Sequence, residues 1–295
     1  MAKFFKAFII TLLLIVILFV GSIGYFLIKN HVENPKDFLK EFSESENRLT
    51  FLLLGVDSLD AKSAENTRSD TIMIVNMDFQ TGDTNIISVP RDTYAEIKGY
   101  KKQKINHSYN YGGSELTLQT VNNLLGTDIK YYMTIDYRFV KDVVNTIGGV
   151  EVDVPVDMYY KDEWADPPLE IDLKAGLQTL NGDKAIQFLR FRKYSEADLA
   201  RVSAQQQFVS AFLQKLKEPS SLLKAPLMMN SYDKYTISNI PFSMIVKAGI
   251  NVRKVSSDKI SVTTLPGVAK YKNKISYFFL NEEEADTLLK GLNLK

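Results

Sequence analysis

Two carboxylates in this sequence stand where a metal ion could be bound. Asp57 follows the apolar run at residues 50–56, and Asp70 opens the next apolar run at residues 70–78. If the two runs form neighbouring strands, both carboxylates lie at one edge of a sheet. Magnesium binds one or two carboxylates together with oxygens of a substrate phosphate, so the pair suits that ion. The alternative is that both aspartates only cap turns.

Basic residues dominate three further clusters, each beside a predicted strand or helix. Arg91 follows the predicted strand at residues 85–89, and Lys104 opens the segment KINHSY. Arg190 and Arg192 belong to LRFRK, and in an extended segment alternate side chains point to the same side. On the helix expected next, three polar residues share one face, namely Asp198, Arg201 and Gln205.

These basic clusters favour a phosphorylated ligand. The planar fork of arginine binds phosphate through two parallel hydrogen bonds. Several of the arginines lie at strand ends, where ligand crevices form in α/β sheets. The alternative is a set of solvated or ion-paired surface arginines. Taken alone, the residues predict an anionic ligand that binds together with a divalent cation.

The composition excludes several other kinds of site. No cysteine is present, which excludes disulfides, thiolate nucleophiles and zinc–thiolate centres. Of the two histidines, His31 lies in a polar segment, and His107 either serves as a base or makes a loop hydrogen bond. Two histidines so placed give little support to a histidine metal site or a Ser–His–Asp triad. A glycine-rich phosphate loop of the dinucleotide or Walker type is also missing from the sequence.

The charge of the chain is divided between its amino terminus and the rest. The formal net charge is +1, and residues 1–29 contribute +3 of it through Lys3, Lys6 and Lys29. The remaining residues therefore carry a net charge of −2. A near-neutral domain does not neutralise nucleic-acid phosphates, so we expect no nucleic-acid partner.

The amino terminus has the pattern of a membrane anchor. Residues 7–28 are 22 uncharged and mostly apolar positions, and as a helix they would cover about 33 Å, enough for a hydrocarbon core of about 30 Å. Lys3 and Lys6 precede the run, which predicts a cytoplasmic tail at 1–6 and an exported remainder. The alternative is a cleavable signal peptide, whose apolar region is usually shorter. Residues 29–48 are polar and predict a stalk.

The exported part, residues 49–295, alternates strand and helix patterns. Such alternation favours one α/β domain with a mixed central sheet sandwiched between helices, here preceded by the single transmembrane helix. A boundary near residue 220, where Pro219 and Pro226 interrupt the chain, is the alternative. The predicted strands are 50–56, 70–78, 85–89, 130–135 and 150–154, and the predicted helices are 114–125, 136–147, 181–189, 196–216 and 282–292.

At these clusters the sequence resembles the LytR–CpsA–Psr family of cell-envelope glycopolymer transferases. The resemblance spans roughly residues 50–215, and the amino-terminal anchor agrees with the layout of the family. The matching motifs are LLLGVDS, RSDTIMIV, SVPRDTY, KINHSYNYGG, TIGGVEVDVP, GLQTLNGDKAIQFLRFRK and DLARVSAQQQ.

The resemblance implies an α/β fold with a deep apolar pocket for a polyprenyl tail and a pyrophosphate held at its mouth. It assigns Mg²⁺, or Mn²⁺, to Asp57 and Asp70, and catalysis to Arg91, Asp70 and Asp198. Asp92 is a second candidate for the general base. The pyrophosphate would contact Arg68, Arg91, Lys104, Arg190, Arg192, Arg201 and Gln205.

The reaction implied by the resemblance attaches an anionic glycopolymer, such as wall teichoic acid or capsule, to muramic acid of peptidoglycan. The polymer would come from a polyprenyl-pyrophosphate carrier, and the bilayer would be contacted through residues 7–28. Three alternatives remain at this point: a polyprenyl-pyrophosphate pyrophosphatase, an envelope-associated regulator of transcription, and a non-catalytic lipid-binding module. The sequence does not identify the polymer.

Overall fold

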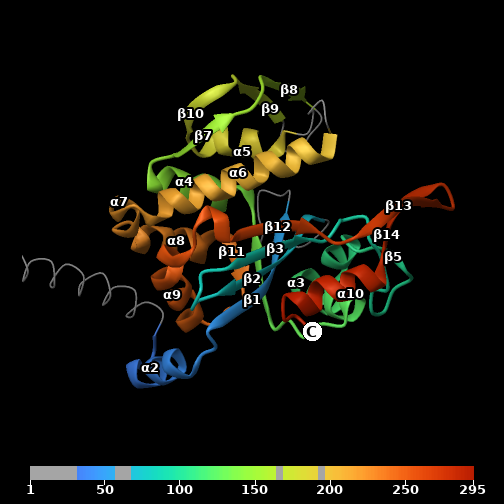
Figure 1. The fold of residues 1–295 in the computed structure, drawn as a ribbon, viewed down its shortest axis with the longest axis horizontal. Helices are drawn as coiled ribbons and strands as arrows, with labels where there is room; N and C mark the ends of the chain where they lie inside the picture. The colour runs from blue at the N-terminus through green and yellow to red at the C-terminus, as the bar shows by residue number, and fades with distance from the viewer. Residues whose placement is uncertain (1–31, 57–67, 164–168, 192–196) are drawn as a thin grey trace, which may run out of the picture.

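A six-stranded mixed sheet forms the centre of the molecule (Figure 1). The computed structural model describes residues 32–56, 68–163, 169–191 and 197–295. The strand order is β11-β6-β1-β2-β3-β12, with β1 parallel to β6, β3 parallel to β12, and the other pairs antiparallel. The strands are β1 Arg48–Val56, β2 Ser69–Asp78, β3 Thr84–Ser88, β6 Tyr131–Ile135, β11 Thr236–Ser238 and β12 Ile260–Thr264. The predicted mixed α/β sheet is confirmed.

The two edges of this sheet carry different ends of its strands. The carboxyl ends of β1, β3, β6 and β12 lie together with the amino end of β2. We call this end of the sheet the carboxyl edge. At the opposite edge, called the amino edge, β1 begins and β2 ends. The register pairs Val56 with Ser69, so the two apolar runs form neighbouring strands, as the sequence predicts, while Asp57 lies outside the described residues.

The two faces of the sheet are covered to different extents. On one face the apolar side chains are almost fully buried, with Leu52, Leu54 and Ile74 at 0% exposure, and they pack against α3 (His107–Leu125) and α10 (Glu282–Gly291). On the other face a row of large apolar residues is only half-buried, namely Phe51, Leu53, Met73, Met77, Ile86, Tyr131 and Met133. Helix α9 (Phe242–Asn251) packs on this face near the amino edge, through Met244.

A second apolar core lies above the sheet in Figure 1. It joins three helices to two small two-stranded sheets: α4 (Tyr137–Ile147), α5 (Gly182–Arg190) and α6 (Ala197–Lys217) with β7 (Val150–Val154), β8 (Met158–Asp162), β9 (Leu169–Leu173) and β10 (Gly176–Leu180). Asp136 and Asn181 cap α4 and α5 by accepting backbone N–H bonds from Phe139 and Lys184, at 3.0 Å each, so both predicted caps are confirmed.

The remaining elements surround this framework. Two hairpins, β4 (Tyr94–Ala95) with β5 (Gln103–Lys104) and β13 (Gly267–Lys272) with β14 (Ile275–Leu280), lie beside α3 and α10. Two short helices follow α6, α7 (Pro219–Leu222) and α8 (Ala225–Tyr235), and the 3-10 turns are Val252–Lys254 and Ser257–Lys259. Within the predicted stalk, α2 (Pro35–Glu44) packs on α9, with the rings of Phe38 and Phe242 5.9 Å apart.

One difference from the sequence expectations concerns a helix. The helix predicted at 114–125 begins seven residues earlier, at His107, and it is interrupted at Gly112 and Gly113. Gly113 has a φ of 62°, which lies in the left-handed region that glycine tolerates. The predicted anchor at residues 7–28 and most of the predicted loop at 162–168 lie outside the described residues. None of the helices in the described ranges is long and apolar enough to span a membrane.

Candidate functional site

The carboxyl edge brings together an arginine and a carboxylate from neighbouring strands. Arg68 is exposed just before β2, Asp70 is the second residue of β2, and Arg91 follows β3 by three positions. The Nη1 of Arg91 donates to Oδ1 of Asp70 at 2.9 Å. The side chains of Arg91 and Asp70 stay 41% and 27% exposed, so a ligand can reach both.

A glycine lets the two strands approach closely at this point. A Cβ on Gly55 would lie 2.9 Å from the Cβ of Thr71, on the strand that carries Asp70. Any larger residue at position 55 would push β1 and β2 apart and displace Asp70 from Arg91. The glycine of the LLLGVDS motif therefore has a steric role at the end of the strand.

The segment after Arg91 is held by its own backbone. The amide N–H of Asn106 donates to the carbonyl of Arg91 at 3.2 Å, and that of Ile105 donates to Thr93 at 2.8 Å. This pairing places Lys104 beside Asp92, with Nζ 2.8 Å from Oδ1. Arg91 and Lys104 are thirteen positions apart in sequence, and these bonds hold them close together at the carboxyl edge. We call the part of that edge that carries Arg68, Arg91 and Lys104 the charged corner.

His107 lies within the field of these cations. Partial burial lowers the pKa of its imidazole, and the positive charges of Arg68 and Lys104 lower it further, while Asp92 opposes the change. The imidazole is therefore neutral at neutral pH. Arg68, Lys104 and Asp92 therefore all act on this one side chain.

Arg190 reaches the carboxyl edge from a helix, so the expectation of an extended segment is wrong at this residue. It is the last residue of α5, and its guanidinium lies 4.8 Å from the ring centre of Tyr137, the first residue of α4 after β6. The helix runs one residue further than predicted because Phe191, buried at 4%, provides its cap. The alternation argument for Arg190 and Arg192 therefore fails, and Arg192 itself lies outside the described residues.

The sequence analysis missed a second arginine at this edge. Arg138 donates from Nε and Nη2 to Oδ2 of Asp136 at 3.0 and 2.7 Å. The Asp136 side chain is fully buried, and Arg138 also lies 5.1 Å from the ring centre of Tyr235. The sequence does contain a signal for this arginine. Tyr137 and Arg138 directly follow a strand and the aspartate that caps the next helix, and the first turn of a helix that follows a strand lies close to the strand ends.

Several predicted site residues are not described by the structure. Asp57 and Arg192 lie outside the described residues, and the side chains of Asp198, Arg201 and Gln205 in α6 do so as well. Of the predicted set, Arg68, Asp70, Arg91 and Lys104 gather around β2, β3 and β5. Arg190 lies near the end of β6, about 14 Å away if three strand spacings separate β6 from β3.

The described residues allow a test of the predicted metal ion. Asp70 has one carboxylate oxygen engaged by Arg91, and Oδ2 has no partner among the residues that the structure describes. Within those same ranges no group of three or more acidic or histidine side chains is arranged to hold a metal. One free carboxylate oxygen fits a magnesium ion that takes most other ligands from phosphate and water, so Asp70 is compatible with that ion.

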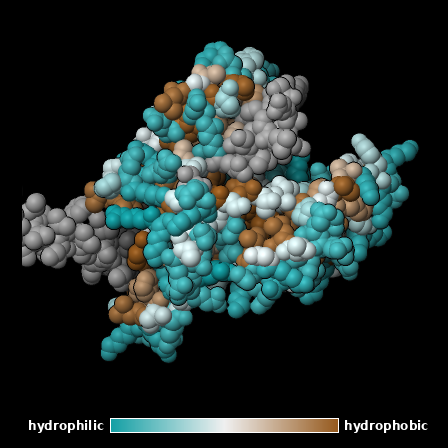
Figure 2. Space-filling view, in the orientation of Figure 1, coloured by the Kyte–Doolittle hydropathy of each residue, from teal (hydrophilic) through white to brown (hydrophobic). Residues whose placement is uncertain are grey.

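Apolar surface lies beside the charged corner. The half-buried face of the sheet brings Leu53 and Met73 to the strand positions next to Gly55 and Thr71. Figure 2 shows apolar surface in the middle of the molecule, near β3 and β12. A separate cavity of about 470 Å³ lies between the end of α3 and α10, lined by Leu125, Asp286 and Lys295 among others. That cavity contains none of the predicted site residues.

Comparisons with known proteins identify relatives of this chain. The profile of the LytR_cpsA_psr family matches residues 26–294. The polyisoprenyl-teichoic acid–peptidoglycan teichoic acid transferase TagV of Bacillus subtilis is 28% identical over 298 residues, covering 94% of this chain and 75% of TagV. Regulatory protein MsrR of Staphylococcus aureus is 29% identical over 250 residues, 83% of this chain and 73% of MsrR.

Solved structures share the fold. The crystal structure of TagV from B. subtilis superposes with a TM-score of 0.69 at 28% identity, covering 85% of this chain and 99% of TagV. A structure of TagT bound to LIIa-WTA superposes with a TM-score of 0.65 at 25% identity, covering 84% of this chain and 90% of TagT. The fold described above is therefore the fold of these proteins.

Proposed function

The chain belongs to the LytR–CpsA–Psr family, and we propose that it transfers an anionic glycopolymer from a polyprenyl-pyrophosphate carrier to muramic acid of peptidoglycan. One observation carries the proposal: a corner with Arg68, Arg91 and Lys104 adjoins a half-covered apolar face of the sheet. A polyprenyl pyrophosphate has the same two parts, an anionic head and an apolar tail. The names of TagV and TagT, and the LIIa-WTA bound to TagT, favour wall teichoic acid over capsule as the polymer.

The basic residues of the corner would bind the pyrophosphate. Arg91 is half-exposed and has one described partner, Asp70. A guanidinium so placed has further N–H groups for phosphate oxygens. Lys104 adds a point charge, Arg68 adds another cation just before β2, and Arg190 would contribute from near the end of β6, about 14 Å away. In this proposal Arg192, Arg201 and Gln205 complete the set from the start of α6.

The half-covered face of the sheet would bind the tail. Seven large apolar side chains on this face are half-buried, whereas those on the opposite face are almost fully buried. Burying apolar area stabilises a complex by about 25 cal/mol per Å², so a lipid chain laid along this face would be retained. Four of these side chains, Phe51, Met77, Tyr131 and Met133, pack against the core cluster that includes Met244 of α9, so the tail would follow the rest of the row, Leu53, Met73 and Ile86.

The transfer itself is a phosphoryl substitution. The muramic-acid hydroxyl attacks the phosphorus that carries the polymer, and the bond from that phosphorus to the bridging oxygen of the pyrophosphate breaks. The polymer ends in a phosphodiester on peptidoglycan, and polyprenyl phosphate leaves with the electron pair. Arg91 and the neighbouring cations would stabilise the charge that develops on the phosphate oxygens.

A carboxylate must accept the proton of the attacking hydroxyl. Asp92 lies at the corner, is 41% exposed and is held by Lys104 at 2.8 Å. Asp198, the other candidate, lies in the first turn of α6. Changing each to Asn separates them, since only loss of the base removes the acid limb of the pH–rate profile, where the rate falls as the base becomes protonated.

We also propose that Asp57 and Asp70 hold Mg²⁺, or Mn²⁺. A divalent ion at this position would neutralise pyrophosphate oxygens and polarise the reacting phosphorus. Asp70 would contribute its free Oδ2, while Arg91 keeps Oδ1 oriented. Retention of full transfer activity in excess chelator would remove the ion from the proposal.

The position of the protein in the cell is a further part of the proposal. Residues 7–28 would anchor the chain in the cell membrane, with residues 1–6 in the cytoplasm and the domain on the cell-wall side. Protease added to intact protoplasts should then release the domain by cutting after Lys29. Protection of the domain from that protease would contradict both the topology and an extracellular function.

The experiment that tests the function measures phosphoryl transfer from a synthetic polyprenyl-pyrophosphate-linked saccharide to a peptidoglycan fragment. Product that carries the saccharide, and release of polyprenyl phosphate only when the acceptor is present, would support the transferase. Release at the same rate without acceptor would instead identify a pyrophosphatase. The name of MsrR supports a regulatory role as the second candidate function. A folded protein with neither transferase nor pyrophosphatase activity would favour that regulatory role.

A further inference from the structure

The hairpin of β13 and β14 projects from the molecule beyond α10 (Figure 1). Asn273 and Lys274 both have positive φ angles, 52° and 67°, which is the conformation of a two-residue hairpin turn. The tight turn fixes the register, with Lys272 opposite Ile275. Its outer part is exposed to solvent: Tyr271 is 80% exposed and Ile275 48%.

The composition of the hairpin is basic and aromatic. Lys270, Lys272 and Lys274 lie within five positions, and residues 267–280 contain no acidic residue. Neither Lys270 nor Lys274 forms an ion pair with a residue that the structure describes. The neighbouring loop between β4 and β5 adds exposed lysines at Lys98, Lys101 and Lys102.

The stem of the hairpin is bonded to the segment that carries the proposed site. The amide N–H of Phe278 donates to the carbonyl of Asp92 at 2.9 Å, and Phe278 also bridges to Thr93. Asp92 directly follows Arg91. From Phe278 to the turn at Lys274 the strand covers about 13 Å. The lysines of the hairpin therefore begin near the charged corner and continue outward from it.

One face of the hairpin is directed toward that segment. Lys272 Nζ donates to the hydroxyl of Tyr94 at 2.9 Å and lies 4.3 Å from the centre of its ring. The ring of Tyr94 also contacts Tyr277 and Phe279, at 5.0 and 5.4 Å between centroids. Lys270 is on the same face, because its cross-strand partner is Tyr277. Cationic and aromatic groups thus form one surface that begins at the corner.

We propose that this hairpin surface binds the phosphodiester-linked polymer of the donor substrate as it leaves the pyrophosphate site. The inference rests on the proposed function for the identity of the donor. Lysines spaced along a strand suit a repeating chain of phosphates, because each is a flexible point charge, and the partly buried rings of Tyr94 and Tyr277 on the same face suit the polyol or sugar units between the phosphates. Continuity with the corner favours the polymer over an anionic lipid surface as the ligand.

A binding experiment without lipid or acceptor tests this inference apart from transfer activity. The full chain in detergent micelles is titrated with long poly(glycerol phosphate) and, separately, with glycerol phosphate monomer. We expect the polymer to bind far more tightly than the monomer, with an affinity that falls as salt rises. In the triple variant K270Q/K272Q/K274Q the affinity for the polymer should fall about tenfold, since each exposed charge contributes modestly.

A matched control carries the same loss of charge elsewhere. K40Q/K130Q/K184Q removes three exposed lysines of α2, the loop before β6 and α5, and it should bind the polymer as the unchanged protein does. Equal polymer binding by both triple variants would overturn the inference. It would also be overturned if the hairpin variant kept polymer binding and instead lost binding to vesicles rich in phosphatidylglycerol, because the hairpin would then be a membrane contact.

Discussion

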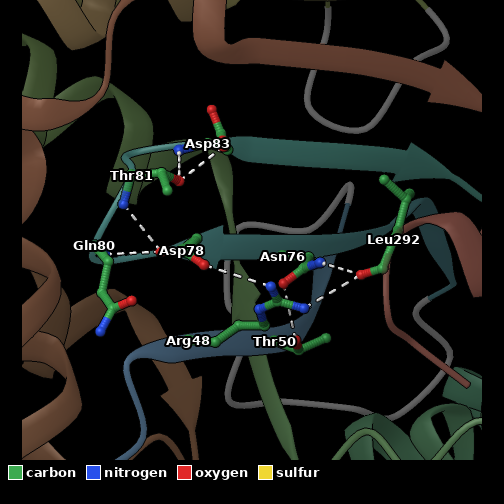
Figure 3. Close-up of polar contacts among 8 residues, drawn as sticks. All are labelled: Arg48, Thr50, Asn76, Asp78, Gln80, Thr81, Asp83 and Leu292. Atoms are coloured by element: carbon green, nitrogen blue, oxygen red, sulfur yellow. Dashed lines mark hydrogen bonds and ion pairs between the residues drawn. The ribbon is translucent and has the colours of Figure 1, made fainter.

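Each end of β2 carries an aspartate paired with an arginine, and the two pairs differ in what surrounds them. At the amino edge, Arg48 lies 3.4 Å from Asp78 and also donates to the carbonyl of Leu292 (Figure 3). Oδ1 of Asp78 accepts the backbone N–H groups of Gln80 and Thr81, at 2.7 and 3.0 Å. This pair ties strand, turn and carboxyl terminus together.

Asn76 extends the same network toward the end of the chain. Its Nδ2 donates to Leu292 at 3.1 Å, and its Oδ1 accepts from Thr50 at 3.2 Å (Figure 3). The amino edge therefore satisfies its polar groups within the chain. Because groups already satisfied by the protein have little capacity for a ligand, we assign this edge a structural role.

At the carboxyl edge the corresponding pair is left open. Asp70 accepts from Arg91 alone among the described residues, and two further cations act on His107, namely Arg68 and Lys104, of which Lys104 is paired with the half-exposed Asp92. The same two residue types thus stabilise the fold at one edge and leave binding capacity at the other. We infer that an arginine–aspartate pair is structural when several further groups of the protein bond to it, and that it can bind a ligand when few do.

The largest expected effect follows from Asp70→Ala at the open edge. Loss of a carboxylate that orients Arg91 and holds the proposed ion should slow transfer by about 10² to 10³-fold, the range for removal of one preorganised electrostatic group. The melting temperature should change little, because an exposed pair contributes about 0–1 kcal/mol. Asp128→Ala, an exposed carboxylate before β6, is the control. Normal turnover of the Asp70→Ala protein would place the chemistry elsewhere.

A smaller effect is expected for Arg91→Ala. Hydrogen bonds to charged groups contribute about 1.5–3 kcal/mol, which corresponds to about one to two decades in rate. Arg91→Lys should restore little, because a point charge cannot replace the planar fork. Transfer rates and melting curves are compared with Arg253→Ala, which removes an exposed arginine of the 3-10 turn. Early unfolding with normal turnover of the folded fraction would make Arg91 structural.

The closed edge should show the reverse pattern. Asp78→Ala leaves two turn amides without their acceptor, which should lower the free energy of unfolding by about 1–3 kcal/mol. The kcat/KM for transfer should stay unchanged, since the residue lies at the other end of β2. Denaturant unfolding and transfer assays on one preparation measure both quantities. A tenfold loss of activity in the folded variant would break the distinction between the edges.

The smallest expected effect is a dependence on pH at the closed edge. The backbone N–H of Thr81 is the main cause that lowers the pKa of Asp78 below its ordinary value of 3.8, helped by Gln80 and Arg48 and opposed by burial. Stability from this carboxylate is therefore fully present above pH 3.8 and is lost as pH falls through the lowered pKa. The melting difference between the protein and Asp78→Asn should shrink below pH 3.8. A difference that is constant with pH would mean that the charge of Asp78 is irrelevant.

Local signals in the sequence were enough to predict most of the framework. Alternating apolar residues and the caps Asp136, Asn181 and Gly148 identified β1, β2, α4 and α5. Strand β11 was missed because three residues are too few to show a period, and β12 at the other edge of the sheet was missed as well. The β13–β14 hairpin was missed because its turn, Asn273-Lys274, lacks the glycine that usually marks such turns.

The sequence identified candidate site residues but not how they are arranged in space. The pairing of the strands that precede Asp57 and carry Asp70 followed from the pattern, and β1 and β2 are neighbours, whereas Asp57 itself lies outside the described residues. The helical position of Arg190 and the Asp136–Arg138 pair depend on where one helix ends and another begins. Sequence alone seldom fixes such ends to within one residue. Which arginine has N–H groups left for a ligand also depends on contacts between segments far apart in the chain.

His107 provides the most direct measurement of the central claim, that the carboxyl edge is an anion site. Its pKa is lowered by burial and by the charges of Arg68 and Lys104, so an anion bound between those charges should raise it. The imidazole resonance is followed by NMR against pH with and without saturating farnesyl pyrophosphate, in a protein carrying His31→Gln so that one histidine remains. The account predicts an upward shift of the His107 pKa in the complex, with no such shift for farnesol. A pKa that stays the same in the pyrophosphate complex would contradict it.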